Sequence, residues 1–155
     1  MAGSRIMNTE HKLDFAKALA AYAHQGQKDK AGKPYIFHPL AVAEKMEGET
    51  EKVVAVLHDV MEDSNVEFMT LYNLFGYDIA NAVKALTKES WEPYMVYIQR
   101  VGENPLARKV KLADLEHNMD LGRLHSITDK DRERTEKYKK AYDYLKSIPD
   151  GRKEF

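Results

Sequence analysis

The 155-residue chain contains no cysteine. That absence excludes disulfide bonds, thiolate metal sites and cysteine nucleophiles, and it fits a reducing compartment such as the cytoplasm. No apolar run approaches the roughly 20 residues that a membrane-spanning helix needs, and the N-terminus carries no secretory signal. The net charge is −1, so no excess of either sign points to nucleic acid or a membrane as the main partner. We therefore expect a cytoplasmic protein with neither of those partners.

Runs of β-branched residues, which a sheet would need, are also missing, whereas nearly every segment has the apolar spacing of a helix. The length fits one domain with a core of its own. We predict an all-α fold, a helical bundle whose single domain spans residues 8–148. Residues 1–7 are expected to be a disordered lead or a cloning remnant, and residues 149–155 a loose tail.

One apolar stretch carries an unusual concentration of charge. A helix predicted from about Thr50 to Glu62 holds the pairs His58-Asp59 and Glu62-Asp63. A buried helix has no structural need for four ionisable groups within six residues. Buried charges are costly unless they pair, bind a metal or face a cleft. The stretch therefore predicts a functional site.

Four candidate metal ligands come from three separate segments, namely His38, His58, Asp59 and Asp114. Two imidazoles and two carboxylates without sulfur suit an octahedral ion such as Mn²⁺ or Fe²⁺ better than structural zinc. Such a site would leave positions open for water and a substrate oxygen. Each residue also has a simpler interpretation: a His-Asp dipeptide is common, His38 can brace a turn, and Asp114 can pair with Lys111 or another nearby cation.

Three further polar residues share the faces of these ligands. Glu62 and Asp63 lie one turn after His58 and are candidates to orient water or carry a proton, although they can also be a plain acidic helix end. Asn118 follows Asp114 by four residues and can hydrogen-bond a substrate or a ligand. The neighbouring His117 is interpreted as a surface or packing residue.

Taken together, the order of four blocks resembles the RelA/SpoT-type alarmone hydrolase domain, a branch of the HD-domain metal-dependent phosphohydrolases. The resemblance runs from about His11 to Leu124, and the chain has no room for a synthetase domain, so it looks like a stand-alone small hydrolase. The matching blocks are His24-Gln25-Gly26-Gln27, Gly32 to Ala43 around His38-Pro39, Leu57 to Asp63, and Lys111 to Asn118.

The resemblance implies one Mn²⁺ held by the four candidate ligands and removal of the 3′-pyrophosphate from guanosine tetra- or pentaphosphate. It further implies that Glu62 and Asp63 activate water and that Asn118 contacts the nucleotide sugar. The loop cations Lys28 and Lys30, with Arg123, are candidates for neutralising phosphate, and simple solvation is their alternative.

One departure from the family pattern bears on the base. Asp29 occupies the loop position where relatives carry an arginine that stacks on guanine, and a carboxylate cannot provide that cation–π contact. The adenosine analogue of the alarmone (ppApp), or another nucleotide such as NADPH, is therefore an alternative substrate. A non-catalytic helical interaction module is the remaining alternative.

Overall fold

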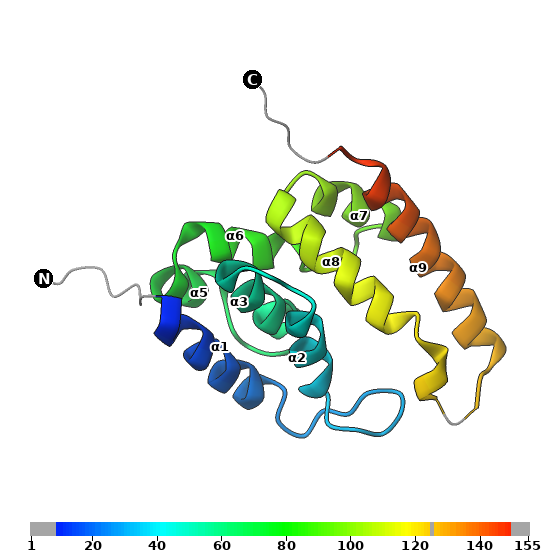
Figure 1. Ribbon diagram of the computed structural model, residues 1–155, viewed down its shortest axis with the longest axis horizontal. Coiled ribbons are helices and arrows are strands. Elements are labelled where there is room, and N and C mark those ends of the chain that lie inside the picture. The colour runs from blue at the N-terminus through cyan, green and yellow to red at the C-terminus, as the bar shows by residue number, and fades with distance from the viewer. Residues whose placement is uncertain (1–8, 125, 150–155) are drawn as a thin grey trace, which may run out of the picture.

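A computed structural model describes residues 9–124 and 126–149 and shows a helical bundle (Figure 1). Within those ranges the only β-structure is an isolated bridge between Lys28 and Pro34. The predicted all-α class is confirmed. The elements are α1 (Thr9–Ala23), α2 (Phe37–Glu44), α3 (Glu49–Leu57), α4 (Val60–Asp63), α5 (Phe68–Phe75), α6 (Tyr77–Ala85), α7 (Tyr94–Gly102), α8 (Pro105–Asn118), the 3₁₀-helix η1 (Leu121–Arg123) and α9 (Asp129–Ser147).

Helix α3 lies at the centre of the bundle. Five consecutive residues, Val53 to Leu57, are buried, because α3 packs against α1, α2, α6 and α8. A helix surrounded in this way needs apolar side chains on all its faces, which the run Val-Val-Ala-Val-Leu provides. The helix that leads directly into His58 is therefore enclosed by other helices.

Helices α7, α8 and α9 form the other side of the bundle, where α8 packs against both of the others (Figure 1). The start of α8 is encoded locally: Pro105 is the first helical residue, and the Asn104 side chain accepts a hydrogen bond from the Ala107 amide at 2.9 Å. Helix α9 begins with a capping box between Thr128 and Asp131.

The predicted continuous helix from Thr50 to Glu62 was wrong. Helix α3 ends at Leu57, and α4 starts at Val60 after a turn in which Asp59 has φ −107° and ψ 0°. The His58 side chain explains the break, because its Nδ1 lies 2.6 Å from the carbonyl oxygen of Ala55. In an unbroken helix that carbonyl would accept a hydrogen bond from the Asp59 amide. The His58 side chain takes the place of that backbone donor, and the helix bends there.

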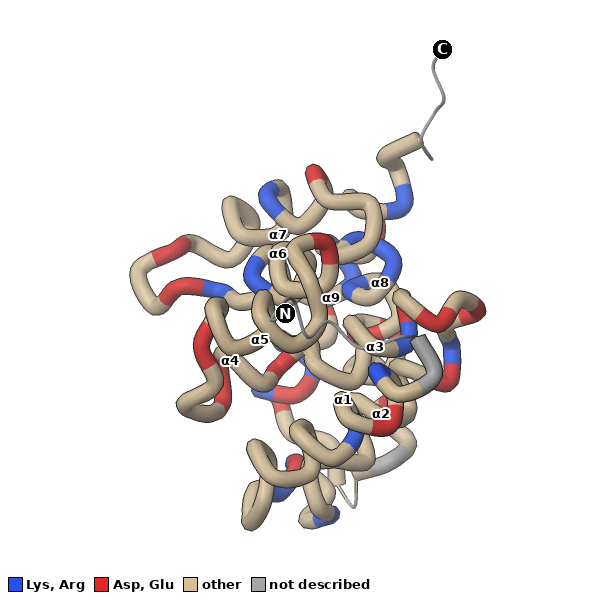
Figure 2. Tube along the Cα trace, turned by 90° about the vertical axis from the view of Figure 1, so that its left-hand side faces the viewer, with Lys and Arg blue, Asp and Glu red and all other residues tan. Residues whose placement is uncertain are grey.

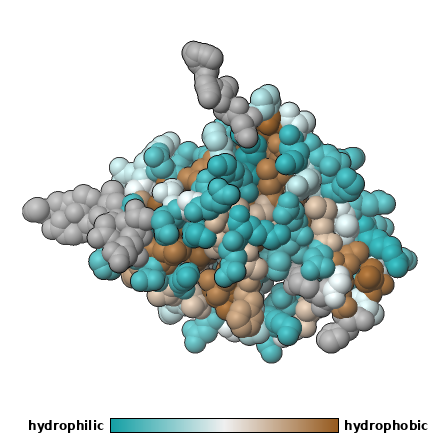
Figure 3. All heavy atoms as spheres, in the orientation of Figure 1, coloured by the Kyte–Doolittle hydropathy of each residue, from teal (hydrophilic) through white to brown (hydrophobic). Residues whose placement is uncertain are grey.

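The surface is mainly hydrophilic, with hydrophobic patches scattered among polar side chains on the face in Figure 3. Acidic and basic residues are mixed along most of the chain (Figure 2). Across the described residues, no helix combines the length and the apolar character that crossing a membrane requires.

Candidate metal centre

Three of the four predicted ligands converge in the core. His38 from α2, His58 from the turn after α3, and Asp114 from α8 each offer a ligand atom, and these atoms lie within 4.8 Å of one another. The Asp114 Oδ1 oxygen is 2.6 Å from His38 Nε2 and 3.3 Å from His58 Nε2. All three residues are buried, with exposed fractions of 4%, 2% and 3%. Asp114 thus meets His38, 76 positions earlier in the sequence, and His58, 56 positions earlier. They meet because α2, α3 and α8 pack against one another.

Both imidazoles are oriented through their other ring nitrogen. His58 Nδ1 donates to the Ala55 carbonyl, which leaves the Nε2 lone pair directed at the cluster. His38 Nδ1 lies 2.7 Å from His117 Nδ1, and the two rings stack with centroids 4.9 Å apart. Sequence reasoning missed this role of His117, because a contact across 79 positions leaves no mark in helical periodicity. Partners of this kind fix the ring orientation of metal-binding histidines.

Asp59 lies at the edge of the cluster. Its Oδ2 oxygen is 3.2 Å from His58 Nε2 and accepts a hydrogen bond from the Tyr35 hydroxyl at 2.5 Å. Burial, followed by the charge of Asp59, raises the pKa of Tyr35 far above its usual value, so the phenol remains a donor. Tyr35 is a second residue that the sequence analysis did not identify.

Asp114 divides its two oxygens between different partners. Oδ1 faces the histidines and also accepts a hydrogen bond from Asn118 Nδ2 at 3.2 Å, whereas Oδ2 is 2.9 Å from the Lys111 ammonium. Burial opposes the charge of Asp114, but Lys111 and His58 outweigh it and hold its pKa well below the usual range. The pairing of Asp114 with Lys111 and its contact with the histidines therefore coexist.

The donor set fits a divalent cation. Ligand atoms of one ion with bonds of about 2.1 Å are separated by about 3 Å at adjacent octahedral corners, close to the 2.6–3.3 Å spacing observed. Nitrogen lone pairs and carboxylate oxygens at this spacing repel unless a cation lies among them. When no metal is bound, this cation is a proton on His58. Burial disfavours the protonated imidazole, but the charges of Asp59 and Asp114 raise the pKa of His58 to about 9.

Glu62 and Asp63 lie on α4 beside this cluster, outside the ligand group of His38, His58 and Asp114. Desolvation, together with the charge of Asp59, raises the pKa of both carboxyl groups, that of Asp63 to about 6. The Lys88 amide donates to Glu62 Oε1 at 3.1 Å. Carboxylates with raised pKa values beside a candidate metal site are candidates for proton exchange.

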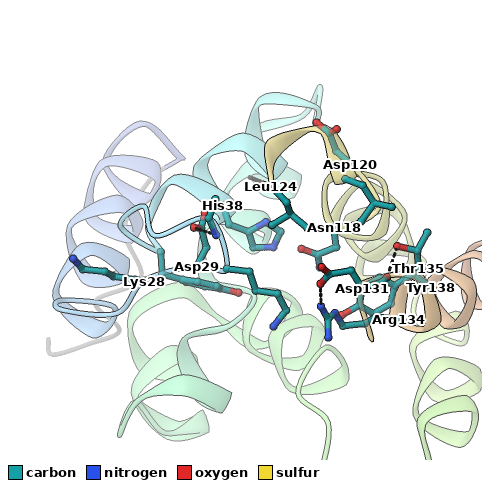
Figure 4. A pocket seen from close by; sticks show the side chains of 14 residues that line it. Lys28, Asp29, His38, Asn118, Asp120, Leu124, Asp131, Arg134, Thr135 and Tyr138 are labelled. Atoms are coloured by element: carbon teal, nitrogen blue, oxygen red, sulfur yellow. Dashed lines mark hydrogen bonds and ion pairs between the residues drawn. The ribbon is translucent and has the colours of Figure 1, made fainter. Parts of the chain in front are cut away.

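A cavity of about 250 Å³ opens beside His38 (Figure 4). Lys28, Lys30 and Asn118, which were predicted to bind substrate, are among the residues that line it. Arg123 is the last residue of η1, and its side chain lies outside the described part of the structure. The complete lining is Lys28, Asp29, Lys30, Ala31, Tyr35, His38, Asn118, Asp120, Leu121, Leu124, Asp131, Arg134, Thr135 and Tyr138.

The Asp29 carboxylate closes its own loop. Its Oδ1 oxygen accepts hydrogen bonds from the amides of Ala31 at 2.9 Å and Lys33 at 3.0 Å. Gly32 has φ +84°, a conformation that favours glycine, and its amide donates to the Asp29 carbonyl at 3.0 Å. The carboxylate thus shapes the loop from which Lys28 and Lys30 border the cavity.

The far wall of the cavity comes from α9. Arg134 and Asp131 form an ion pair there, and Tyr138 adds an aromatic ring (Figure 4). These residues supply a cation and an apolar surface opposite the lysine loop. Their spacing of three and four positions matches one helix face, but nothing in the sequence placed that face against residues near position 30.

A family model described as "HD domain" matches residues 16–101, and that span contains His38, the His58-Asp59 pair and the Glu62-Asp63 pair. The chain belongs to the HD domain family. This confirms the HD-type bundle predicted from the four blocks. Asp114 lies beyond the matched residues, and the packing of α8 brings it to the HD residues.

Known relatives of this HD domain include alarmone enzymes. The bifunctional (p)ppGpp synthase/hydrolase SpoT of Escherichia coli K12 is 33% identical over 124 residues, which cover 70% of this chain and 18% of that protein. The guanosine-3′,5′-bis(diphosphate) 3′-pyrophosphohydrolase of Aquifex aeolicus VF5 is 35% identical over 116 residues, covering 66% of this chain and 16% of that protein. The chain thus spans less than a fifth of these curated relatives.

One solved structure matches this chain over most of the length of both proteins. It is that of a metazoan ortholog of SpoT, described as hydrolysing ppGpp and playing a role in starvation responses. The two structures superpose with a TM-score of 0.72 at 26% identity, over 88% of this chain and 86% of the other. The resemblance to RelA/SpoT-type alarmone hydrolases, inferred above from the sequence, is confirmed.

Proposed function

We propose that this HD domain is a metal-dependent pyrophosphohydrolase that removes the 3′-pyrophosphate from guanosine 3′,5′-bis(diphosphate) or a closely related alarmone. The observation that carries the proposal is the position of the His38–His58–Asp114 cluster beside a cavity bordered by Lys28, Lys30 and Arg134. A cluster of this kind suits a divalent ion, and the cations suit a substrate with several phosphates. The relatives' activities support the same substrate class.

In this proposal His38, His58, Asp59 and Asp114 hold the ion, with Mn²⁺ preferred and Fe²⁺ as the alternative, because the donor set is nitrogen and oxygen without sulfur. The ion, when bound, supplies Lewis acidity that makes water a better nucleophile and phosphorus a better electrophile. Glu62 and Asp63 orient the water and accept its proton.

The remaining residues bind the substrate in this reaction scheme. Asn118 contacts the sugar next to the 3′-oxygen, while Lys28 and Lys30, with Arg123 and Arg134, neutralise phosphate groups. Water attacks the phosphorus bonded to the 3′-oxygen, that P–O bond breaks, and the 3′-oxygen leaves as a hydroxyl. The products are GDP and pyrophosphate.

The adenosine analogue is the second candidate substrate, and the loop geometry favours considering it. Asp29 binds the amides of Ala31 and Lys33 and offers no cation for stacking on guanine. Selection between the two bases would then depend on the aromatic and apolar residues of the cavity wall, Tyr138 and Leu124 among them.

The test is incubation of the Mn²⁺-loaded protein with the guanosine and adenosine alarmones in parallel, with GDP, ADP and pyrophosphate separated by ion-exchange chromatography. We expect pyrophosphate release from at least one of them. In the Glu62→Gln variant, kcat should fall by about 10²-fold or more while metal content and the circular dichroism spectrum stay unchanged. If the wild-type protein releases pyrophosphate from neither substrate, the proposed function is wrong.

A further inference from the structure

The loop between α6 and α7, residues 86–93, reaches the α4 carboxylates across 26 positions of sequence. The backbone amide of Lys88 donates to Glu62 Oε1 at 3.1 Å. A backbone donor is fixed in space only as well as the loop that carries it. The placement of the Glu62 carboxylate therefore depends on what holds this loop.

An arginine–glutamate pair holds the loop. Arg100 of α7 binds Glu92 through two parallel contacts, Nε to Oε2 at 2.9 Å and Nη2 to Oε1 at 2.8 Å. The Glu92 side chain is only 3% exposed, and Oε1 also accepts the Glu89 amide at 3.1 Å. Bidentate pairing of this kind fixes both distance and orientation, which a lysine could not do equally well.

The same guanidinium also binds the backbone at the N-terminal end of the loop. Its Nη1 donates to the carbonyls of Lys84 at 3.4 Å and Ala85 at 3.2 Å, and its Nη2 donates to the carbonyl of Thr87 at 3.0 Å. These carbonyls belong to the last residues of α6 and the first of the loop. A single side chain thus joins the residues before and after Lys88, the position whose amide binds Glu62.

We propose that Arg100 and Glu92 are positioning residues for hydrolysis, which hold the Lys88 amide where it orients the Glu62 carboxylate toward the water. This inference rests on the proposed function, because it assigns Glu62 to water activation. Arg100 acts through the loop and touches neither substrate nor metal. Its loss is expected to lower kcat and leave the KM for substrate and the Mn²⁺ affinity within twofold of wild type.

The experiment is a double-mutant cycle with Arg100→Met and Glu62→Gln in Mn²⁺-loaded protein. If the pair works through Glu62, Arg100→Met lowers kcat about tenfold in the wild-type background and has no further effect once Glu62 is changed. Arg100→Lys should restore part of the rate, since it retains a donor but not the fork. Glu92→Gln gives an independent second variant and should reproduce the kcat loss.

A matched control removes an ion pair away from the site. Lys45 contacts Glu116 Oε1 at 3.1 Å between α2 and α8, and Lys45→Met should leave kcat unchanged. A kcat loss of equal size in both the wild-type and Glu62→Gln backgrounds would mean that Arg100 serves only the general fold, and the inference would be overturned. An unchanged kcat in Arg100→Met would overturn it as well.

Amide hydrogen exchange separates this inference from the proposed function. The Lys88 amide should exchange about tenfold faster in Arg100→Met than in the wild-type protein, because the loop then opens locally more often. If wild type hydrolyses neither alarmone, the proposed function fails and the exchange result alone decides whether Arg100 fixes the Lys88 donor. Exchange at the wild-type rate would refute that fixation.

Discussion

The buried ion pair between Lys111 and Asp114 allows a quantitative test of the metal centre. Lys111→Met keeps the length and apolar stem of the side chain and removes its positive charge. The Lys111 ammonium lies 2.9 Å from Asp114 Oδ2, with exposed side-chain fractions of 12% and 5%. In metal-free protein the substitution leaves a buried carboxylate with less compensation, so we expect the free energy of unfolding to fall.

The magnitude follows from the distance. At 2.9 Å and an effective dielectric constant of about 20, the attraction is about 6 kcal/mol. Part of this loss is offset, because the methionine variant does not pay the cost of removing the lysine ammonium from water on folding. The net decrease in the free energy of unfolding is about 3 kcal/mol. For a chain of this size that loss lowers Tm by about 9 °C.

Bound metal should reduce the stabilising effect of the lysine. A divalent ion beside Asp114 takes over the compensation of its charge, and the Lys111 ammonium then repels that ion. We therefore expect the Tm difference between variant and wild type to shrink in saturating Mn²⁺, and the Kd for Mn²⁺ to be about tenfold lower in the variant.

Thermal unfolding followed by circular dichroism, with EDTA or with Mn²⁺, measures the first effect, and isothermal titration calorimetry measures the second. Lys109→Met on the same helix is the control: Lys109 binds Glu51 Oε2 at 2.8 Å, but its side chain is 60% exposed, so its loss should cost less than about 1 kcal/mol. An equal Tm difference in both conditions, or weaker Mn²⁺ binding by Lys111→Met, would refute the reasoning.

Three further predictions concern the same structure. Tyr35→Phe removes the hydroxyl donor to Asp59 and should weaken Mn²⁺ binding by about 10- to 100-fold in calorimetry; an unchanged Kd would contradict a supporting role. The Arg100 hydrogen bonds outweigh desolvation and lower the pKa of Glu92 from 4.5 to about 2. The ionised Glu92 therefore stabilises the folded state fully above pH 4.5, and this contribution is lost as pH falls toward 2. Glu92→Gln should therefore cost about 2 kcal/mol in urea unfolding at pH 7, and a deficit that persists at pH 2 would argue against this linkage. Mn²⁺ at 100-fold its Kd should add about 3 kcal/mol to the free energy of unfolding of wild type and almost none to His58→Ala; equal gains would place the ion elsewhere.

The helices and three converging ligand candidates could be predicted from the sequence because their signals are local or repeated. Apolar spacing predicted the helix that contains α3, and Asn104-Pro105 marks the start of α8 through a cap that involves only neighbouring residues. The ionisable groups around His58 were conspicuous because the helix around them is otherwise apolar. Such signals need no knowledge of which helices touch.

The supporting residues could not be predicted, because their roles arise from contacts between distant segments. Tyr35 reaches Asp59 across 24 positions, and His117 reaches His38 across 79. The turn at His58 was missed for a different reason: a histidine side chain bonded to the Ala55 carbonyl interrupts a helix that apolar periodicity alone would continue. Periodicity records which face is buried, but it does not record what a buried polar atom binds.

The position of α3 explains why the candidate site requires a cation. Helix α3, which packs against four other helices, ends just before His58, so two imidazoles and two carboxylates meet where little water can hydrate them. Without metal, the cluster must retain a proton that burial disfavours, as the raised pKa of His58 indicates. A divalent ion would compensate the same lone pairs and carboxylates in place of the proton. Under the proposed function, burial links the stability of the fold to metal binding, while Glu62 and Asp63, at the more exposed edge, exchange protons with water.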